Sequence, residues 1–343
     1  MALGTNQSTI TTGANFISEQ WSDEVIAAYK QKLVLGNLVT KFSFKGKKGD
    51  TLHLPVPARG DASAKSANTQ VTLIADTAGV VDVLINKHFE YSKLYEDIAE
   101  MQALNSMRRF YTDDAGYALA KRIDKDLHLL GAGFNGGAIA AATSYEKAVI
   151  GGDGSTLFSG ATPGNGTIIT DAGLRKMIQV LEDQDINSSE LNLVVPPVES
   201  NVMRGIARFT EQAFVGDGSV LKTGRLGNVY GVEVYTSTNC PWIHVNSVTS
   251  TQSVTFSSTA PTGAAYVDEL GTTIDWSTSS PTDTKYRAGM LLHKDAMCLA
   301  EQMTIRSQAQ YKQEYLGTLV TSDTIYGTKE LRDYAALAFV VPA

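Results

Sequence analysis

Residues Phe44 to Gly60 read FKGKKGDTLHLPVPARG, and this stretch decides how the whole chain is organised. From Thr51 to Pro57 polar and apolar residues alternate, which indicates a strand with one face to bury. Pro55 and Pro57 each lack the N–H group that a central strand donates to its neighbour. The sequence therefore predicts an edge ribbon that projects from its own domain and finds its packing face on another molecule.

A second alternating run, Val80 to His88, is expected to lie beside the first. The segment between the two runs is rich in small residues and too long for a tight hairpin. We therefore predict a long two-stranded flap with a loose tip. Because an isolated ribbon is only marginally stable in water, the flap needs a partner surface.

The bulk composition indicates a globular protein that folds without disulfides. The chain has 343 residues, of which 43% are hydrophobic and 19% charged. Its only cysteines, Cys240 and Cys298, are far apart, which excludes a disulfide framework and a CxxC site. No run of apolar residues is long enough to span a membrane, and the N-terminus lacks the features of a signal peptide.

The formal net charge of −7 argues against a dedicated nucleic-acid-binding protein, which needs a basic face. An acidic wall could still enclose DNA without adhering to it.

The charges also form local groups along the chain. A basic group on the flap contrasts with an acidic run further along the chain, at the start of the expected long helix, and both could be solvated surface or a complementary contact between copies. The basic residues are Lys45, Lys47, Lys48, Arg59 and Lys65, and the acidic ones are Glu96, Asp97 and Glu100.

Before the flap, residues 1–15 are polar and predict an extended arm. Trp21, Val25, Tyr29 and Leu33 then recur every four residues. This spacing predicts a helix over residues 18–35, called the leader helix below, which ends at Gly36.

After the flap, the periodicities predict one long helix or two helices from about Asp97 to Leu130. A loop region over residues 131–168 and a mixture of helices and strands follow. A Ser- and Thr-rich stretch, residues 247–284, indicates an exposed, strand-rich insertion. The remaining expected elements are a helix over 170–185, a strand over 191–195, a helix from Pro197 to Ile206, a strand over 228–235 interrupted at Gly231, and strands over 288–293, 297–307 and 335–341.

Two motifs bear on catalysis, and neither is complete. Residues 131–136 match GxGxxG, but they follow an expected helix, whereas a dinucleotide fingerprint follows a strand. Ser144 with Lys147, together with Lys222-Thr223-Gly224, is typical of a serine acyl enzyme, but the Ser-Asp-Asn element is missing. The five histidines are scattered and predict no metal site. We therefore expect no catalytic residue, no cofactor and no metal.

The order of elements resembles that of the major capsid proteins of tailed bacteriophages, which have the HK97-like fold, and it is most similar to the short-tailed podovirus branch. Four stretches carry this resemblance across nearly the whole chain. They are Lys47–Pro55, similar to the entry of the family's E-loop; Tyr95–Leu130, similar to the spine helix and its approach; Gly227–Val234, similar to an A-domain pattern; and Tyr326–Arg332 with the following strand, similar to the closing turn. Asp333 stands where a proline is common in that turn.

The resemblance implies an α+β, HK97-like capsid fold. It places an N-terminal arm and helix at 1–40, an extended β-hairpin E-loop at 41–92 and the P-domain spine helix at 93–135. The A domain follows at 136–286 with the insertion 247–284, and residues 287–343 return to the strands of the P domain. In such shells the flap lies over the P domain of an adjacent subunit.

The resemblance also implies the function and the partners. It indicates a non-enzymatic shell protein that assembles as pentamers and hexamers in the bacterial host cytoplasm, encloses double-stranded DNA in the virion and works with a portal, a separate scaffolding protein and, in some relatives, a cement protein. A bacterial encapsulin-type compartment is an alternative use of the same fold, and a serine acyl enzyme is a remote one. The expected contacts between subunits are Trp21, Tyr29, Lys47, Lys48, Leu52, Leu54, Val56, Arg59, Glu96, Asp97 and Glu100.

Overall fold

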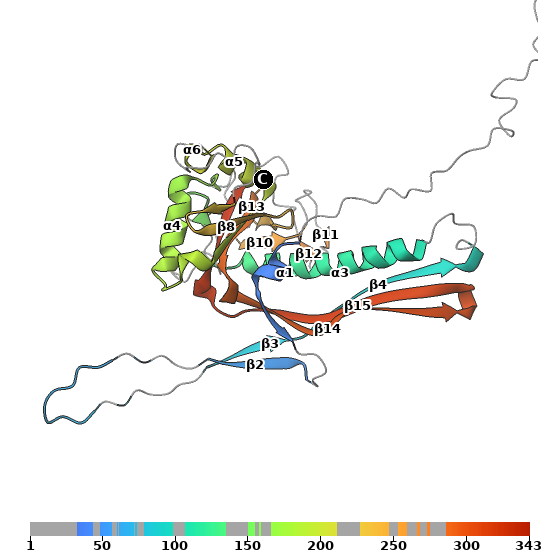
Figure 1. Ribbon diagram of the computed structural model, residues 1–343, viewed down its shortest axis with the longest axis horizontal. Helices are drawn as coiled ribbons and strands as arrows, with labels where there is room; N and C mark the ends of the chain where they lie inside the picture. The colour runs from blue at the N-terminus through green and yellow to red at the C-terminus, as the bar shows by residue number, and fades with distance from the viewer. Residues whose placement is uncertain are drawn as a thin grey trace, which may run out of the picture.

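The computed structural model has a globular part and an elongated part, with a ribbon projecting from the junction between them (Figure 1). The residues that it describes are 33–43, 49–56, 60, 62–71, 73, 79–98, 107–134, 150–154, 158, 166–210, 227–246, 253–258, 266–267, 273–274 and 286–343. Within these ranges the chain combines helices and sheets, as the predicted α+β class requires.

The globular part is built on an 8-stranded sheet whose central strand is β13 (Tyr286–His293). β13 pairs antiparallel with β16 (Ala336–Pro342), β6 (Leu191–Val195) and β9 (Trp242–Asn246). β16 is apolar throughout, and β13 and β6 are buried along most of their length, because side chains pack on both faces of the sheet. The other members are β5 (Ile150–Gly151), β7 (Asn228–Val229), β8 (Val232–Thr236) and β10 (Ser253–Ser257).

Helices α4 (Asp171–Glu182) and α5 (Pro197–Arg204) belong to this globular part. The side chain of Thr170 accepts a hydrogen bond from the N–H of Gly173 and caps α4, and a proline begins α5. Leu174, Met177 and Leu181 of α4 are fully buried in the main hydrophobic cluster. The predictions of these two helices and of strand 191–195 are confirmed.

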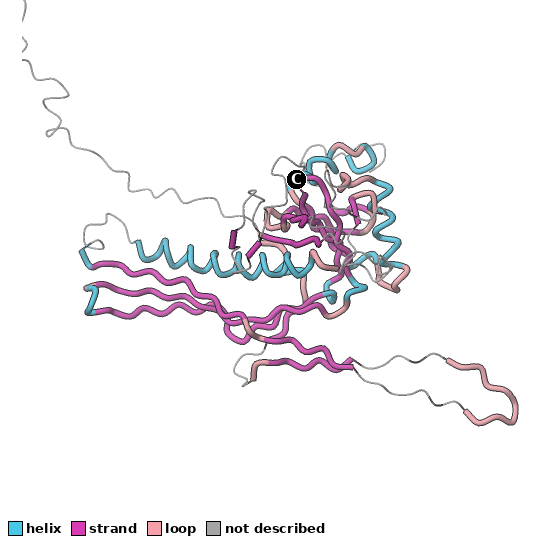
Figure 2. The backbone as a smooth tube through the Cα atoms, turned by 180° about the vertical axis from the view of Figure 1, so that it is seen from behind, coloured by secondary structure: helices cyan, strands magenta, loops and turns pink. Residues whose placement is uncertain are grey.

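The elongated part consists of helix α3 (Met107–Gly131) lying along a 4-stranded sheet (Figure 2). The sheet order is β1 (Thr40–Ser43), β14 (Met297–Lys312), β15 (Gly317–Glu330) and β4 (Lys87–Glu96). β4 alternates between half-buried and exposed residues along its whole length, which is the pattern of a strand with one covered face. A second hydrophobic cluster, containing Leu127, Phe134 and Tyr326, joins α3 to both sheets.

Three sequence expectations about the elongated part are wrong. The run Val80–His88 is two strands, β3 (Gly79–Leu84) and β4, because the chain leaves the ribbon at Ile85 and enters a different sheet. Residues 93–96 continue β4, so Glu96 ends a strand and does not begin the long helix. β15 was missed, because it mixes polar and apolar residues without a clear period.

The expected strand over 228–235 is a hairpin of β7 and β8, which pair antiparallel around Tyr230 and Gly231. Both turn residues have positive φ, 54° and 85°, as a two-residue hairpin of the favoured handedness requires. A glycine in the second turn position adopts this conformation without strain. The predicted interruption at Gly231 is therefore confirmed. The strand stops there because the chain reverses direction in the turn of the hairpin.

The Ser- and Thr-rich insertion contributes β10, which pairs with β9, and two short strands, β11 (Tyr266–Val267) and β12 (Thr273–Ile274), which pair with each other. Short helices complete the described chain: α1 (Leu35–Leu38), α6 (Ala207–Thr210), η2 (Ser188–Glu190), η3 (Lys294–Ala296), η4 (Gln313–Tyr315) and η5 (Asp333–Ala335).

Residues 18–32 of the expected leader helix lie outside the described residues. Gly36 lies inside α1, so the expectation that this glycine ends a helix is wrong. Among the described residues, no helix has both the length and the apolar composition needed to cross a membrane.

Candidate assembly surfaces

The flap is a separate 2-stranded sheet made of β2 (Thr51–Val56) and β3, as the sequence predicts. Residues directly opposite each other in such a pair share one face. Leu52 lies opposite Val83 and Leu54 opposite Val81, so these four residues form an apolar face. The other face carries His53 opposite Asp82. The Nδ1 atom of His53 lies 2.5 Å from the Oδ1 atom of Asp82.

The base of the apolar face is covered by the chain's own residues. Val83 is fully buried in a cluster with Ile85, Cys298 and Ala300, and Leu52 and Leu54 pack against this cluster. A Cβ at Gly327 would collide with the carbonyl oxygen of Leu84, so a glycine at this position lets the flap cross β15 closely. The motif Tyr326-Gly327 therefore has a structural role at the root of the flap.

The outer end of the flap is bare. Val56 is 47% exposed and Val80 is 60% exposed, and Val71 and Leu73 in the described part of the tip are also exposed. Figure 1 shows this end extending away from the rest of the molecule, on the side opposite to the elongated sheet. An apolar strand pair that is covered at its base and uncovered at its tip is suited to contact another molecule.

The predicted contact residues divide into three groups. Leu52, Leu54 and Val56 lie on one face of the flap, with Val56 the most exposed. Glu96 and Asp97 lie at the far end of β4 and are separated from the flap by the length of the elongated sheet (Figure 1). Trp21, Tyr29, Lys47, Lys48, Arg59 and Glu100 lie outside the described residues.

Asp97 has a local role that the sequence did not indicate. Its carboxylate accepts a hydrogen bond from the Tyr311 hydroxyl at 2.8 Å, and its N–H donates to the carbonyl of Leu316 at 3.1 Å. These bonds tie the end of β4 to the turn between β14 and β15. Asp97 therefore stabilises the far end of the elongated part.

This far end carries a group of exposed apolar side chains that sequence reasoning missed. Ile98 is 64% exposed and Leu316 is 67% exposed, and Leu94, Tyr311 and Tyr315 beside them are also exposed. In the sequence, the signal for this exposed group was the apolar pair Tyr315-Leu316, which lies between the predicted strands 297–307 and 335–341. We call these five residues the distal apolar tip. Exposed apolar groups of this kind mark contact sites.

The sheet face turned away from α3 carries an ion-pair group. Arg306 binds both carboxylate oxygens of Asp323, at 2.8 and 3.1 Å, and His88 lies 3.2 Å from the same carboxylate. The hydrogen bonds from Arg306 hold the pKa of Asp323 below its usual range. The group links β4, β15 and β14 across the elongated sheet.

The root of the leader helix is fixed by Asp124 of α3. The carboxylate of Asp124 accepts hydrogen bonds from the N–H groups of Val34 and Leu35, at 3.1 and 2.9 Å. It also accepts one from the side-chain amide of Asn239 at 2.7 Å. One buried carboxylate therefore joins the leader, α3 and the turn between β8 and β9. His128, whose pKa is lowered mainly by burial, lies 2.7 Å from the carbonyl oxygen of Asp124.

A second buried carboxylate, Asp126, joins α3 to the elongated sheet. Lys87 donates to Asp126 at 2.9 Å and the Tyr326 hydroxyl donates to it at 2.7 Å. Burial, followed by the nearby Asp126 charge, raises the pKa of Tyr326, so the hydroxyl keeps its proton. The signal in the sequence was the placement of Asp124 and Asp126 among apolar residues of a helix.

Candidate chemical sites are not assembled in the described part of the chain. No group of three or more His, Cys, Asp or Glu side chains there is placed to hold a metal ion. The GxGxxG motif begins at Gly131, the last residue of α3, as expected for a helix stop. Ser144, Lys147 and Lys222 lie outside the described residues.

Comparisons with known proteins agree with this architecture. The model of the phage capsid protein family matches residues 94–293. The fold is similar to the capsid of cyanophage P-SCSP1u, with a TM-score of 0.68, 18% identity and coverage of 99% of this chain and 96% of that one. No curated protein matches the chain at a significant level.

Two further solved structures have the same fold. A structure from Mycobacterium phage Che8 has a TM-score of 0.64 and 19% identity, and covers 95% of this chain and 97% of its own. The capsid of the Helicobacter pylori bacteriophage KHP30 has a TM-score of 0.61 and 13% identity, and covers 100% of both chains. The predicted HK97-like α+β fold is confirmed.

Proposed function

Because this chain belongs to the phage capsid protein family, we propose that its copies interlock through the leader helix, the flap and the elongated part to form a closed shell. The chain is a major capsid protein, a structural protein of a bacteriophage whose copies assemble as pentamers and hexamers into an icosahedral capsid. The proposal concerns which surfaces of this chain carry the assembly.

One observation carries the proposal. The apolar face of the flap is buried at Val83 and bare at Val56, so the same ribbon is fixed on its own subunit and open to another. Burying Val56 on this face, and Val80 at the same end of the opposite face, in a neighbour would stabilise each contact by about 25 cal/mol per Å² of apolar surface removed from water. Many repeated contacts of this size can hold a closed shell together.

The other predicted contact residues are assigned to the same surfaces, the flap and the far end of the elongated part. Leu52 and Leu54 are proposed to complete the base of the contact, and Glu96 and Asp97 to act beside the distal apolar tip. For the residues outside the described ranges, the support is the sequence pattern alone. They are Trp21 and Tyr29 as apolar contacts, and Lys47, Lys48, Arg59 and Glu100 as charged ones.

For the domains, we keep the predicted order of arm, E-loop at 41–92, spine helix at 93–135, A domain at 136–286 and returning strands at 287–343. The continuous strand β4 crosses the boundary between residues 92 and 93. Because β4 pairs with β15 over ten residues, we place all of β4 with the elongated part.

The finer features of the function rest on the sequence. The net charge of −7 supports a wall that encloses double-stranded DNA without binding it tightly. The resemblance in four motifs supports the short-tailed branch, assembly in the host cytoplasm, and a separate scaffolding protein, a portal and a cement protein as partners. The incomplete motifs around Ser144 and residues 131–136 support the absence of enzymatic activity.

A shortened flap tests the proposal. Val56 and Gly79 are paired across the ribbon, so residues 57–78 can be replaced by an Asn-Gly turn that keeps β2, β3 and the buried base intact. We expect a folded subunit with an unchanged melting temperature that forms no closed particles in electron microscopy. Closed particles of normal size from this variant would overturn the role of the flap.

A further inference from the structure

Helix α4 runs along the outer edge of the globular part and carries its charges in two separate groups (Figure 1). One face of the helix packs Leu174, Met177 and Leu181 into the main hydrophobic cluster, so the opposite face is exposed. The exposed face carries cations in its first half and carboxylates at its end. Gln179, which is neutral, lies between the two groups.

The basic group, called the basic end below, consists of Arg175 and Lys176 of α4 with Arg208 of α6. Arg175 and Arg208 both bind the carboxylate of Asp171, at 3.0 and 3.2 Å, and their side chains are 53% and 56% exposed. Because two guanidinium groups share one carboxylate, positive charge remains. Lys176 adds to it, since its ammonium donates to the neutral side chain of Gln179 at 3.4 Å.

The acidic group, called the acidic end below, consists of Glu182, Asp183 and Asp185, which are exposed at the C-terminus of α4. Carboxylates there lie at the negative end of the helix dipole, which is unfavourable. Asp185 also has φ of 61°, a left-handed conformation for which glycine is the usual residue after a helix. Within the described chain none of the three forms an ion pair, so their charges are open to another molecule.

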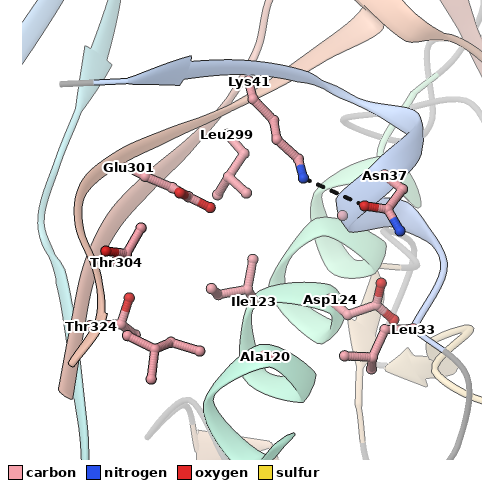
Figure 3. Close-up of a pocket in the computed structure, with 12 residues that line it drawn as sticks. Leu33, Asn37, Lys41, Ala120, Ile123, Asp124, Leu299, Glu301, Thr304 and Thr324 are labelled. Atoms are coloured by element: carbon pink, nitrogen blue, oxygen red, sulfur yellow. Dashed lines mark hydrogen bonds between the residues drawn. The ribbon is translucent and has the colours of Figure 1, made fainter. Parts of the chain in front are cut away.

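The charges of the surface cavity beside α1 are arranged differently. This cavity of about 390 Å³ lies between α1, α3 and the strand β14 (Figure 3). Lys41 and Glu301 both line it, so charges of opposite sign lie within one site. On α4, in contrast, Lys176 and Asp183 are separated by about 10 Å along the helix axis. Helix α4 therefore offers a basic and an acidic surface at two different places.

We propose that the basic end of one subunit binds the acidic end of the next subunit around each pentamer and hexamer. Contacts in a cyclic ring are head-to-tail, so each copy must offer two different surfaces that fit each other. The two ends of α4 meet this requirement, because they are opposite in charge and lie apart on the subunit. The inference rests on the assembly into pentamers and hexamers and adds a contact to the surfaces proposed above.

The contact sets the orientation of neighbouring subunits. Complementary charges at an exposed interface speed the encounter and exclude wrong orientations, because like charges then meet. Salt screens such contacts, so the formation of rings should slow as the ionic strength rises. Every subunit of a ring repeats the contact, so reversing one end affects the whole ring.

Charge reversal tests the contact. One variant carries Arg175→Glu with Lys176→Glu and reverses the basic end. A second carries Glu182→Lys with Asp183→Lys and reverses the acidic end. Each places like charges together, so the yield of rings and shells in sedimentation and electron microscopy should fall at least about tenfold. A third variant combines all four substitutions, keeps the net charge of −7 and restores opposite charges, so it should assemble like the parent.

Melting temperatures separate folding from assembly. All four positions are exposed, so the variants should remain folded, and the variant with lysines at the end of α4 should melt no lower than the parent. An equal mixture of the first two variants should favour rings with an even number of subunits. In such rings the two chains alternate, and every acidic surface meets a basic one.

The variant Asp185→Gly gives an independent readout. It removes a charge that opposes the helix dipole and places glycine in the left-handed position, so the melting temperature should rise. The yield of rings should fall, which a purely local role of Asp185 would not cause. A higher melting temperature with an undiminished yield would contradict the contact at this residue.

Three outcomes overturn the inference. Folded variants reversed at one end that assemble like the parent would show that α4 makes no such contact. Loss of assembly from the basic-end variant alone would show that this end binds something else, such as the enclosed DNA. A folded combined variant that does not assemble would show that the two ends do not bind each other. If the shortened flap still closes particles and the charge dependence persists, only the proposed role of the flap fails.

Discussion

The carboxylate of Asp124 accepts a hydrogen bond from the backbone N–H of Leu35 at 2.9 Å, across 89 positions of the sequence. Asp124 is almost completely buried and lies on the helix that supports the elongated sheet. The bond therefore connects the start of the described chain to the centre of the molecule. It makes Asp124 a sensitive point for the stability of the subunit.

Replacing Asp124 is expected to destabilise the subunit strongly. Asp124→Ala leaves the N–H groups of Val34 and Leu35 and the amide of Asn239 without their acceptor. Since each unsatisfied buried group costs about 1–3 kcal/mol, we expect a loss of about 3 kcal/mol or more in the free energy of unfolding. Urea denaturation measures this loss, and hydrogen exchange of the Leu35 amide should accelerate.

Asp124→Asn is the matched control for this prediction. The asparagine keeps an oxygen that can accept from both backbone N–H groups, and the Asn239 side chain can reorient. We expect a loss of about 1 kcal/mol, the worth of one neutral hydrogen bond. An alanine variant as stable as the asparagine variant would show that the hydrogen bonds contribute nothing.

The two faces of β3 should separate stability from assembly. Val83 is fully buried and Val80 is 60% exposed on the opposite face. Val83→Ala should lower the free energy of unfolding by about 2 kcal/mol, because a buried valine contributes about 1.5–3 kcal/mol. Val80→Ser should change it by less than about 0.5 kcal/mol, as is usual for surface positions, and should reduce the yield of shells. Equal effects of both variants on denaturation would contradict this division.

Glu199 is expected to make the subunit less stable as the pH rises. Its side chain is buried, one oxygen accepts a hydrogen bond from Ile169 N–H at 2.9 Å, and the other has no hydrogen-bond partner among the described residues. Burial raises the pKa of this carboxyl above its ordinary value of 4.5. The folded state then holds the proton more tightly than the unfolded state, so stability falls as the pH rises from 4.5 through the folded pKa.

Glu199→Gln removes this titration and keeps an oxygen for the Ile169 N–H. The variant should be more stable than the parent at pH 7, and the difference should shrink as the pH approaches 4.5. Thermal denaturation at several pH values measures both. A variant that is less stable at pH 7 would show that the charge is compensated by groups near Glu199.

The β7–β8 hairpin gives a test of backbone strain alone. Gly231 has φ of 85°, and a Cβ there would meet nothing within 4 Å. Gly231→Ala should therefore cost about 1–2 kcal/mol from the left-handed conformation only. Gly36, in α1, also has open space but no positive φ, so Gly36→Ala should be neutral or stabilising by up to about 1 kcal/mol. Urea denaturation measures the free energy of unfolding of both variants. Similar changes at positions 231 and 36 would show that the positive φ of Gly231 does not cause the loss.

Local patterns in the sequence determined the elements that carry a clear period or a specific end signal. Helix α4 was predicted because its buried residues recur at helical spacing, and the structure shows that Thr170 caps it. The flap was predicted from alternation and from Pro55 and Pro57, which exclude a central strand. The largely apolar run of β6, interrupted only at Asn192, indicated a buried strand.

The tertiary structure decided where these elements meet. β15 was not predicted, because several consecutive residues are buried along it and some of these, Ser322, Asp323 and Thr324, are polar, so hydrophobicity shows no simple alternation. The split between β3 and β4 at Ile85 follows from the crossing over Gly327, which no local pattern encodes. The distal apolar tip gathers residues from β4, β14 and the turn that joins β14 to β15.

The sequence by itself determined that the chain is a globular protein of helices and strands with a projecting ribbon, because period, proline position and helix ends act over a few residues. Only the tertiary structure decided that the ribbon's apolar face is half covered by its own subunit and that Asp124 holds the root of the leader. These contacts join residues far apart in the chain, and their free energy depends on burial that exists only after folding.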